Sequence, residues 1–130
     1  MKNYSEMTDF EINCLVAEAT GHRPLISQYG WKGSQEGDYT AVVAIGPNGA
    51  GTFDWCNSPG CAWEIILKSR ISILWIESTG IWCANAGGLV EANYWGWDEC
   101  PEVYFENKNP LRAAMIVFLL MQEKKREKTV

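Results

Sequence analysis

The chain has 130 residues, of which 47% are hydrophobic, 11 are basic and 16 are acidic, so its net charge is −5. This size fits one domain with an apolar core that needs no cross-links, and wholesale disorder is excluded. The acidic balance argues against a protein that binds the nucleic-acid backbone, because such proteins normally carry a basic face.

The first predicted element is a helix over residues 9–20. Thr8 and Glu11 have the spacing of a capping box, in which each side chain bonds the other residue's backbone amide. Apolar side chains then recur at helical spacing as far as Ala19. Gly21 follows and offers the left-handed conformation that commonly ends a helix.

The segment after this helix is harder to assign. Residues 22–37 contain three glycines and are predicted as a loop, with a short strand at 24–28 as the alternative. Residues 39–45 are rich in β-branched side chains and predict a strand. The glycine-rich residues 46–51 predict a turn, and 52–55 a short strand that pairs back.

A second helix is expected to start at Ser58 and Pro59, because serine caps a helix and proline fits its first position. Residues 71–77 and 81–86 then predict two strands, separated by a short Ser-Thr-Gly connection. This pattern is typical of a β-hairpin.

The last part of the chain predicts more strand and a closing helix. Residues 91–97 and 102–106 are expected to form a further strand pair, and Asn109 with the proline after it starts the helix. Residues 110–122 are apolar on both faces, which predicts a helix buried inside the domain or against a second copy. Residues 123–130 form a charged tail that is expected to fray into solvent.

Together these elements predict one α+β domain over residues 1–130, a sandwich-like fold in which a small, mainly antiparallel sheet packs with about three helices. No apolar run is long enough to span a bilayer and no signal run opens the sequence, so a cytoplasmic protein without a membrane partner is expected. Five cysteines without a Cys-x-x-Cys motif, and a single histidine, predict neither a disulfide framework nor a zinc site. We therefore expect no cofactor.

Tryptophan is unusually frequent, with seven residues. Trp63 and Trp75 stand in apolar runs and are predicted to lie in the core. Trp95 and Trp97 flank a glycine on a predicted strand, where they share one face and form a platform for a nucleobase, a sugar or a partner's side chain. Trp31, in the glycine-rich loop, is a candidate for the same surface. The alternative is a packed sheet face or a subunit interface.

The two predicted helix starts are further candidates, because their free amides and positive dipole ends can hold a phosphate or carboxylate. Simple capping is the alternative. The candidate ligand- or partner-binding residues are Trp31, Trp55, Asn57, Ser58, Trp95, Trp97, Asn109 and Arg112. No catalytic residue is expected, since no Ser or Cys has a base at recognisable spacing and the carboxylates form no specific pattern.

Three sequence blocks resemble small phage proteins of the NinX type. They are Phe53-Asp54-Trp55-Cys56-Asn57-Ser58-Pro59 with Ala62-Trp63 and Ile71-Ser72-Ile73, then Asn109-Pro110-Leu111-Arg112-Ala113-Ala114-Met115, and Asp9-Phe10-Glu11-Ile12-Asn13 with Val16-Ala17. The chain departs from the common pattern at Trp55, Cys56, Cys61 and residues 88–107. The resemblance implies an accessory gene of a lambdoid phage or prophage, a sandwich-like α+β domain, expression in the bacterial cytoplasm, and no assigned catalytic residue.

These observations lead to the hypothesis of a non-catalytic phage accessory protein that acts by binding. Such proteins often counter host defences, so the expected partner is a small nucleotide signal that the protein sequesters or a host defence protein that it blocks. One alternative is an oligomeric structural or regulatory module assembled through the 110–122 helix. Another is a small hydrolase with Asp98 and Glu99 as its acid pair.

Overall fold

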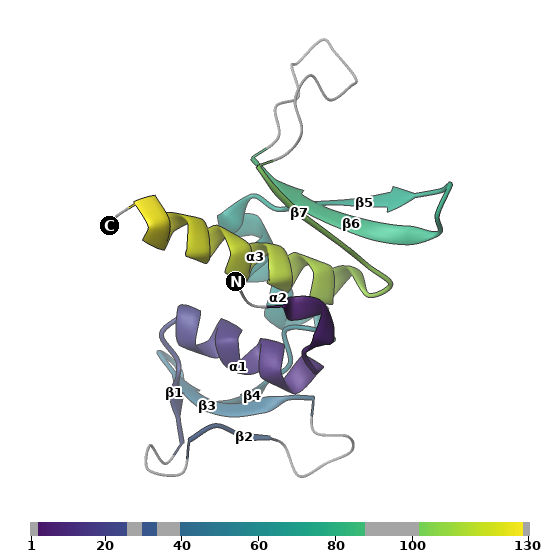
Figure 1. Ribbon diagram of the computed structural model, residues 1–130. Coiled ribbons are helices and arrows are strands. Elements are labelled where there is room, and N and C mark those ends of the chain that lie inside the picture. Colours follow the sequence, from purple (N-terminus) through teal and green to yellow (C-terminus); the bar gives the residue numbers. More distant parts are fainter. Residues whose placement is uncertain (1–2, 26–29, 34–39, 88–101, 129–130) are drawn as a thin grey trace.

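The computed structural model describes residues 3–25, 30–33, 40–87 and 102–128 (Figure 1). In chain order, the elements of this part are the short 3-10 helix η1 (Tyr4–Glu6), α1 (Asp9–Ala19), β1 (Arg23–Pro24), β2 (Lys32–Gly33), β3 (Val42–Gly46), β4 (Gly49–Phe53), α2 (Pro59–Ser69), β5 (Ser72–Ile76), β6 (Ile81–Ala86), β7 (Val103–Asn107) and α3 (Pro110–Lys128). The strands form two antiparallel sheets, β1 to β4 and β5 to β7. The predicted α+β class is confirmed, with two small sheets in place of one.

The long helix α3 lies in the middle of the molecule, between the two sheets (Figure 1). The second sheet packs on it through β6 and β7, while α1 contacts both α3 and β3 of the first sheet. Residues 113–119 of α3 are at most 7% exposed. The apolar helix predicted over 110–122 therefore lies inside the domain, where the chain's own elements cover it.

The predicted limits of α1 are confirmed. Thr8 Oγ1 accepts a hydrogen bond from the Glu11 N–H at 3.1 Å, and Glu11 Oε1 accepts one from the Thr8 N–H at 3.1 Å. Gly21 then has a φ of 82°. In the predicted loop that follows, residues 23–24 and 32–33 form β1 and β2, which pair with neighbouring parts of β3.

The hairpin of β3 and β4 turns within two residues, Pro47 and Asn48, because Gly46 already pairs with Gly49. The predicted turn over residues 46–51 was therefore too long. The physical reason is Gly49, whose φ of 104° reverses the chain at once and allows β4 to start inside the glycine-rich segment.

Helix α2 starts as predicted, with Ser58 Oγ accepting from the Cys61 N–H at 3.5 Å. Its buried side chains are Ala62, Ile65 and Ile66. Trp63 and Leu67 point away from them and are each 58% exposed. The prediction that Trp63 lies in the core was wrong, because this helix is apolar on more than one side and only one side meets α3.

The predicted hairpin of β5 and β6 is confirmed, and β7 pairs with β6. The strand expected at 91–97 lies outside the described residues. Trp75 was predicted to be buried and is 49% exposed. Its ring meets the half-buried Trp82 edge-on, with ring centroids 5.1 Å apart. The core prediction for Trp75 was wrong because its position lies near the end of the sheet that carries the β5–β6 turn.

The charged end of α3 was predicted to fray, but the helix continues to Lys128. The Tyr4 hydroxyl donates to Glu123 Oε1 at 2.5 Å, and Lys124 Nζ donates to the Glu102 carbonyl at 3.1 Å. These tertiary contacts hold a segment that its charge alone would place in solvent. Across the described ranges, no helix combines the length and apolar character that a bilayer crossing requires.

Candidate functional site

A network of polar side chains joins the starts of α1 and α3 to the segment between β4 and α2. We call it the polar junction, and its members are Asp9, Asn13, Asp54, Asn57, Asn109 and Arg112. Asn13 is fully buried: its Nδ2 donates to Asp54 Oδ1 at 2.9 Å, and its Oδ1 accepts from the Cys56 N–H at 3.1 Å. In the described part of the chain, no buried side-chain nitrogen or oxygen lacks a partner.

The two predicted anion sites at helix starts are part of this junction. Asn109 Oδ1 accepts from the amides of Leu111 and Arg112 at 3.0 and 3.3 Å, and its Nδ2 donates to Asn57 Oδ1 at 3.0 Å. The Arg112 guanidinium, 9% exposed as a residue, forms an ion pair with Asp9 at 2.6 Å and donates to the Tyr4 carbonyl at 3.0 Å. The structure thus brings Asn57, Asn109 and Arg112 together as internal partners of one another.

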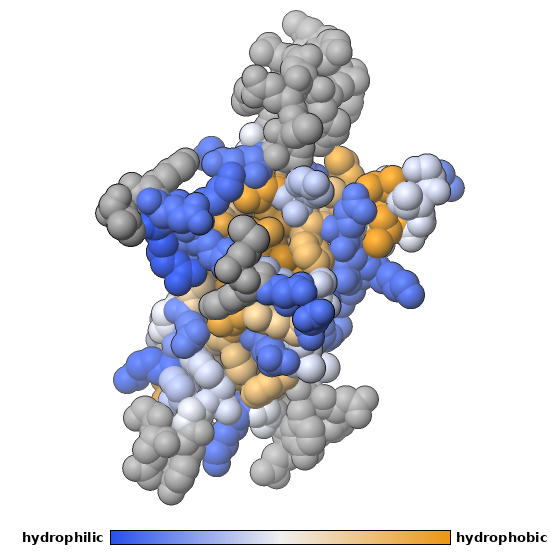
Figure 2. Space-filling model, in the orientation of Figure 1, coloured by the Kyte–Doolittle hydropathy of each residue, from blue (hydrophilic) through white to orange (hydrophobic). Residues whose placement is uncertain are grey.

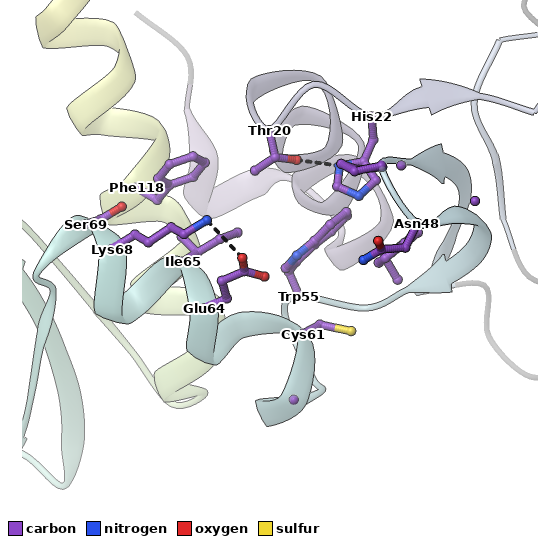
Figure 3. A pocket seen from close by; sticks show the side chains of 15 residues that line it. Thr20, His22, Asn48, Trp55, Cys61, Glu64, Ile65, Lys68, Ser69 and Phe118 are labelled. Atoms are coloured by element: carbon purple, nitrogen blue, oxygen red, sulfur yellow. Dashed lines mark hydrogen bonds and ion pairs between the residues drawn. The ribbon is translucent and has the colours of Figure 1, made fainter.

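A cleft of about 550 Å³ opens on the other side of the β4–α2 segment, between α2 and the β3–β4 turn (Figure 3). We call it the aromatic cleft. One wall carries His22, Phe53 and Trp55. The rings of Phe53 and Trp55 are stacked, with centroids 5.1 Å apart and an interplanar angle of 8°. His22 stands edge-on to both, at 4.7 and 5.3 Å. The opposite wall is α2, with Glu64 and Lys68 (Figure 3).

The hydrogen bonds of His22 determine which ring nitrogen carries the proton. Thr20 Oγ1 lies 2.8 Å from the carbonyl of Val16, to which its single proton is donated, and 2.8 Å from His22 Nδ1. The Thr20 oxygen can then only accept from His22, so Nδ1 holds the hydrogen and Nε2 is an acceptor. Burial lowers the pKa of His22, and this effect outweighs the opposing charge of Glu64. The ring is therefore neutral near pH 7.

The position of His22 depends on Gly46 across the sheet. Arg23 pairs with Ile45, so the histidine before it reaches Gly46. A Cβ atom at Gly46 would lie 2.7 Å from His22 Nε2, which is closer than real Cβ atoms come to other atoms. The absence of a side chain at Gly46 is therefore what allows the imidazole to lie against the aromatic wall.

The charged groups of the cleft balance each other. Lys68 Nζ and Glu64 Oε1 are 2.9 Å apart, and both side chains are more than 70% exposed. The hydrogen bond from Lys68 and its charge lower the pKa of Glu64. Solvent screens such an exposed pair, so either partner can turn to a ligand at little cost.

The remaining groups of the cleft define the contacts that it can offer. Cys61 also lines it, but within the described residues no hydrogen bond joins this thiol to His22, whose Nδ1 is engaged by Thr20. The same described residues contain no group of three or more His, Cys, Asp or Glu side chains that could hold a metal ion. Cys56, next to Trp55, is buried, and burial raises the pKa of its thiol. The cleft therefore offers aromatic surface, one hydrogen-bond acceptor and one exchangeable ion pair.

The sequence of the chain was compared with known protein families. A family model described as Bacteriophage P22, NinX matches residues 3–122. The chain belongs to this NinX family. The phage affiliation suggested by the three sequence blocks is thereby confirmed, and the matched range includes both the polar junction and the aromatic cleft. No curated protein matches the chain.

Among the six candidate residues of this NinX-family chain that the structure describes, Trp55 is the one that lines the aromatic cleft, and it is only 3% exposed. Trp31 is half-buried and lines a separate shallow hollow on α1, with Phe10 and Cys14. Ser58 caps α2. Trp95 and Trp97 lie outside the described residues.

Sequence reasoning missed His22, Phe53 and Lys68 as residues of one site. The alternation of Phe53 and Trp55 was a usable signal, because side chains two apart on an extended segment share a face. No nearby sequence pattern indicates that His22 belongs to the cleft, because its position depends on pairing between strands that are about 20 residues apart.

Proposed function

We propose that this NinX-family chain is a non-catalytic accessory protein of the host cytoplasm that binds a small nucleotide in the aromatic cleft and so sequesters it from a host defence. The observation that carries the proposal is the stacked pair Phe53 and Trp55 beside the neutral His22. The volume of about 550 Å³ lies in the range typical of small-molecule sites.

The aromatic wall suits the base of a nucleotide. Stacking of a base on an aromatic side chain contributes about 1–3 kcal/mol and tolerates different bases. His22 Nε2 adds a directional acceptor, and it favours a base that presents an N–H or amino group. Trp55, which is only 3% exposed, supports this wall from behind by stacking on Phe53.

The opposite wall suits a phosphate of low charge. Lys68 supplies the cation, and Gly60 and Cys61 in the first turn of α2 line the same cleft near the positive end of the helix dipole. Glu64 remains nearby, so the summed charge of the two side chains is zero. This arrangement favours a nucleotide with one phosphate or a bridging phosphate over a polyphosphate.

Calorimetric titration with a panel of cyclic and linear nucleotides tests the proposal. We expect one member to bind, and Phe53→Leu to weaken it by about tenfold or more, since 1.4 kcal/mol corresponds to a factor of ten. Phe105→Leu is the matched control, because Phe105 is also half-buried but lies on β7. Lys68→Gln should weaken nucleotides more than nucleosides, and Lys125→Gln, exposed on α3, should change neither. If none of the nucleotides in the panel releases or absorbs heat on titration, the proposal is contradicted.

Trp63 and Leu67 favour a second candidate function, the blocking of a host defence protein. They lie one turn apart on α2, on a side of the helix that does not line the cleft, and each is 58% exposed. Exposed tryptophans are frequent anchors in protein interfaces. If this function holds, Trp63→Ala abolishes capture of the defence protein from infected cells, whereas Phe53→Leu leaves it intact.

A further inference from the structure

Among the described residues, β5 is an edge strand of the second sheet without a covering element on its outer side. In the part of the chain that the structure describes, β5 pairs only with β6. Figure 1 shows that no helix or other labelled strand lies along its outer side. The backbone groups on that side are available to another strand, which is why proteins usually shield such edges with charges, proline or bulges.

The sequence of β5 contains none of these features that oppose strand pairing. The strand reads Ser-Ile-Leu-Trp-Ile, without a charge or a proline, and its register with β6 is continuous, without a bulge. Leu74 is 42% exposed and Trp75 is 49% exposed, on opposite faces of the sheet. Figure 2 shows apolar surface over this sheet, extending toward the β5–β6 turn. The other edge, β7, carries the charged Glu106 within its sequence.

We propose that β5 pairs antiparallel with β5 of a second copy, so that two three-stranded sheets become one six-stranded sheet. The strand has five residues and Leu74 is its centre. A two-fold axis at this residue places Leu74 opposite its own copy, and Ile73 opposite Trp75 twice. Residues directly opposite share a face, and pairs of aromatic and β-branched side chains are among those that stabilise a sheet.

The charges at the two ends of β5 fit this arrangement. Arg70 precedes the strand and Glu77 follows it, and both are exposed. Antiparallel pairing about Leu74 places Arg70 of each copy opposite Ser78 of the other, one position beyond Glu77, so opposite charges lie near each other at both ends. A second copy therefore complements the edge in backbone, apolar surface and charge. The paired area of five residues is small against the roughly 800 Å² per partner of a standard interface, so the dimer should dissociate on dilution.

Sedimentation velocity over a range of protein concentrations tests this assembly. We expect a reversible dimer, and we expect Leu74→Lys to weaken it at least tenfold, because a lysine on an edge strand opposes strand pairing. Tyr104→Lys is the control. Tyr104 is 58% exposed on the same face of the sheet, at the β7 edge, and should leave the dimer unchanged.

Hydrogen exchange of the unaltered chain gives a second measurement that does not depend on how a variant folds. The amides of residues 73–75 should exchange more slowly at high protein concentration than at low concentration. The proposal is overturned by a chain that stays monomeric at every concentration, by a dimer that Leu74→Lys leaves intact or Tyr104→Lys dissolves, or by exchange that does not depend on concentration.

Discussion

The polar junction and the aromatic cleft lie on the two sides of one short segment, residues 53–57. Asp54 and Asn57 point into the junction, whereas Phe53 and Trp55 point into the cleft. In the junction the polar side chains bond one another and backbone groups of the chain. In the cleft Trp55 is only 3% exposed, whereas Phe53 and His22 are half-buried, so these two rings and the exposed ion pair are the groups within reach of a ligand.

The comparison teaches how to separate structural polar residues from binding residues in this chain. Asn57, Asn109 and Arg112 have the residue types of an anion site, yet their donors are directed to other groups of the protein. A ligand that took the Arg112 donors would leave the Tyr4 carbonyl, the buried acceptor among these bonds, without its partner, at a cost of about 1–3 kcal/mol. The cleft carries no such cost, because its ion pair is already in solvent.

The substitution Arg112→Leu should have the largest effect, and it tests whether the polar junction is structural. The substitution leaves Asp9 without its ion-pair partner and the Tyr4 carbonyl without a donor. Breaking a buried pair on one side costs about 3–5 kcal/mol, and the partial exposure of Asp9 places the expected loss near the lower value. Urea denaturation should show a loss of stability of about 3 kcal/mol. Any folded protein that remains should still bind the cleft ligand, and a loss below about 1 kcal/mol would assign Arg112 to binding instead.

Lowering the pH should have a smaller effect on stability, and this effect arises from His22 in the cleft. Burial holds the pKa of folded His22 below 6.5, its ordinary value, so the unfolded chain binds a proton at a higher pH than the folded chain. The contribution of His22 to stability is complete above pH 6.5 and is lost as the pH falls from there through the folded pKa. Ligand affinity should fall in the same range, because a protonated Nε2 no longer accepts a hydrogen bond.

Denaturation curves between pH 5 and pH 8 measure this effect. His22→Gln should flatten the pH dependence of stability in this range, while Glu64, whose pKa Lys68 holds below 4.5, titrates at lower pH. A histidine whose removal leaves the pH profile unchanged would contradict the neutral, buried state described for it.

Local patterns predicted the elements of this fold well, and long-range contacts explain where prediction stopped. The capping box of Thr8 and Glu11 and the cap at Ser58 are signals within four residues, and both are confirmed. Trp63 and Trp75 were misplaced, because an apolar run does not show which of its sides meets the rest of the chain. His22 and Asn13 acquire their roles from partners 24 to 43 positions away, Gly46 and Cys56, which no spacing rule reveals.

The most direct test of the central claim, that the aromatic cleft is the binding region, uses the seven tryptophans as reporters. The indole N–H signals in a proton–nitrogen NMR spectrum are assigned by single Trp→Phe substitutions and followed as the bound nucleotide from the calorimetric panel is added. The account predicts a large shift for Trp55, a smaller one for Trp63, which lies on α2 outside the cleft, and none for Trp75 on the second sheet. A ligand that shifts Trp75 and leaves Trp55 unchanged would contradict it.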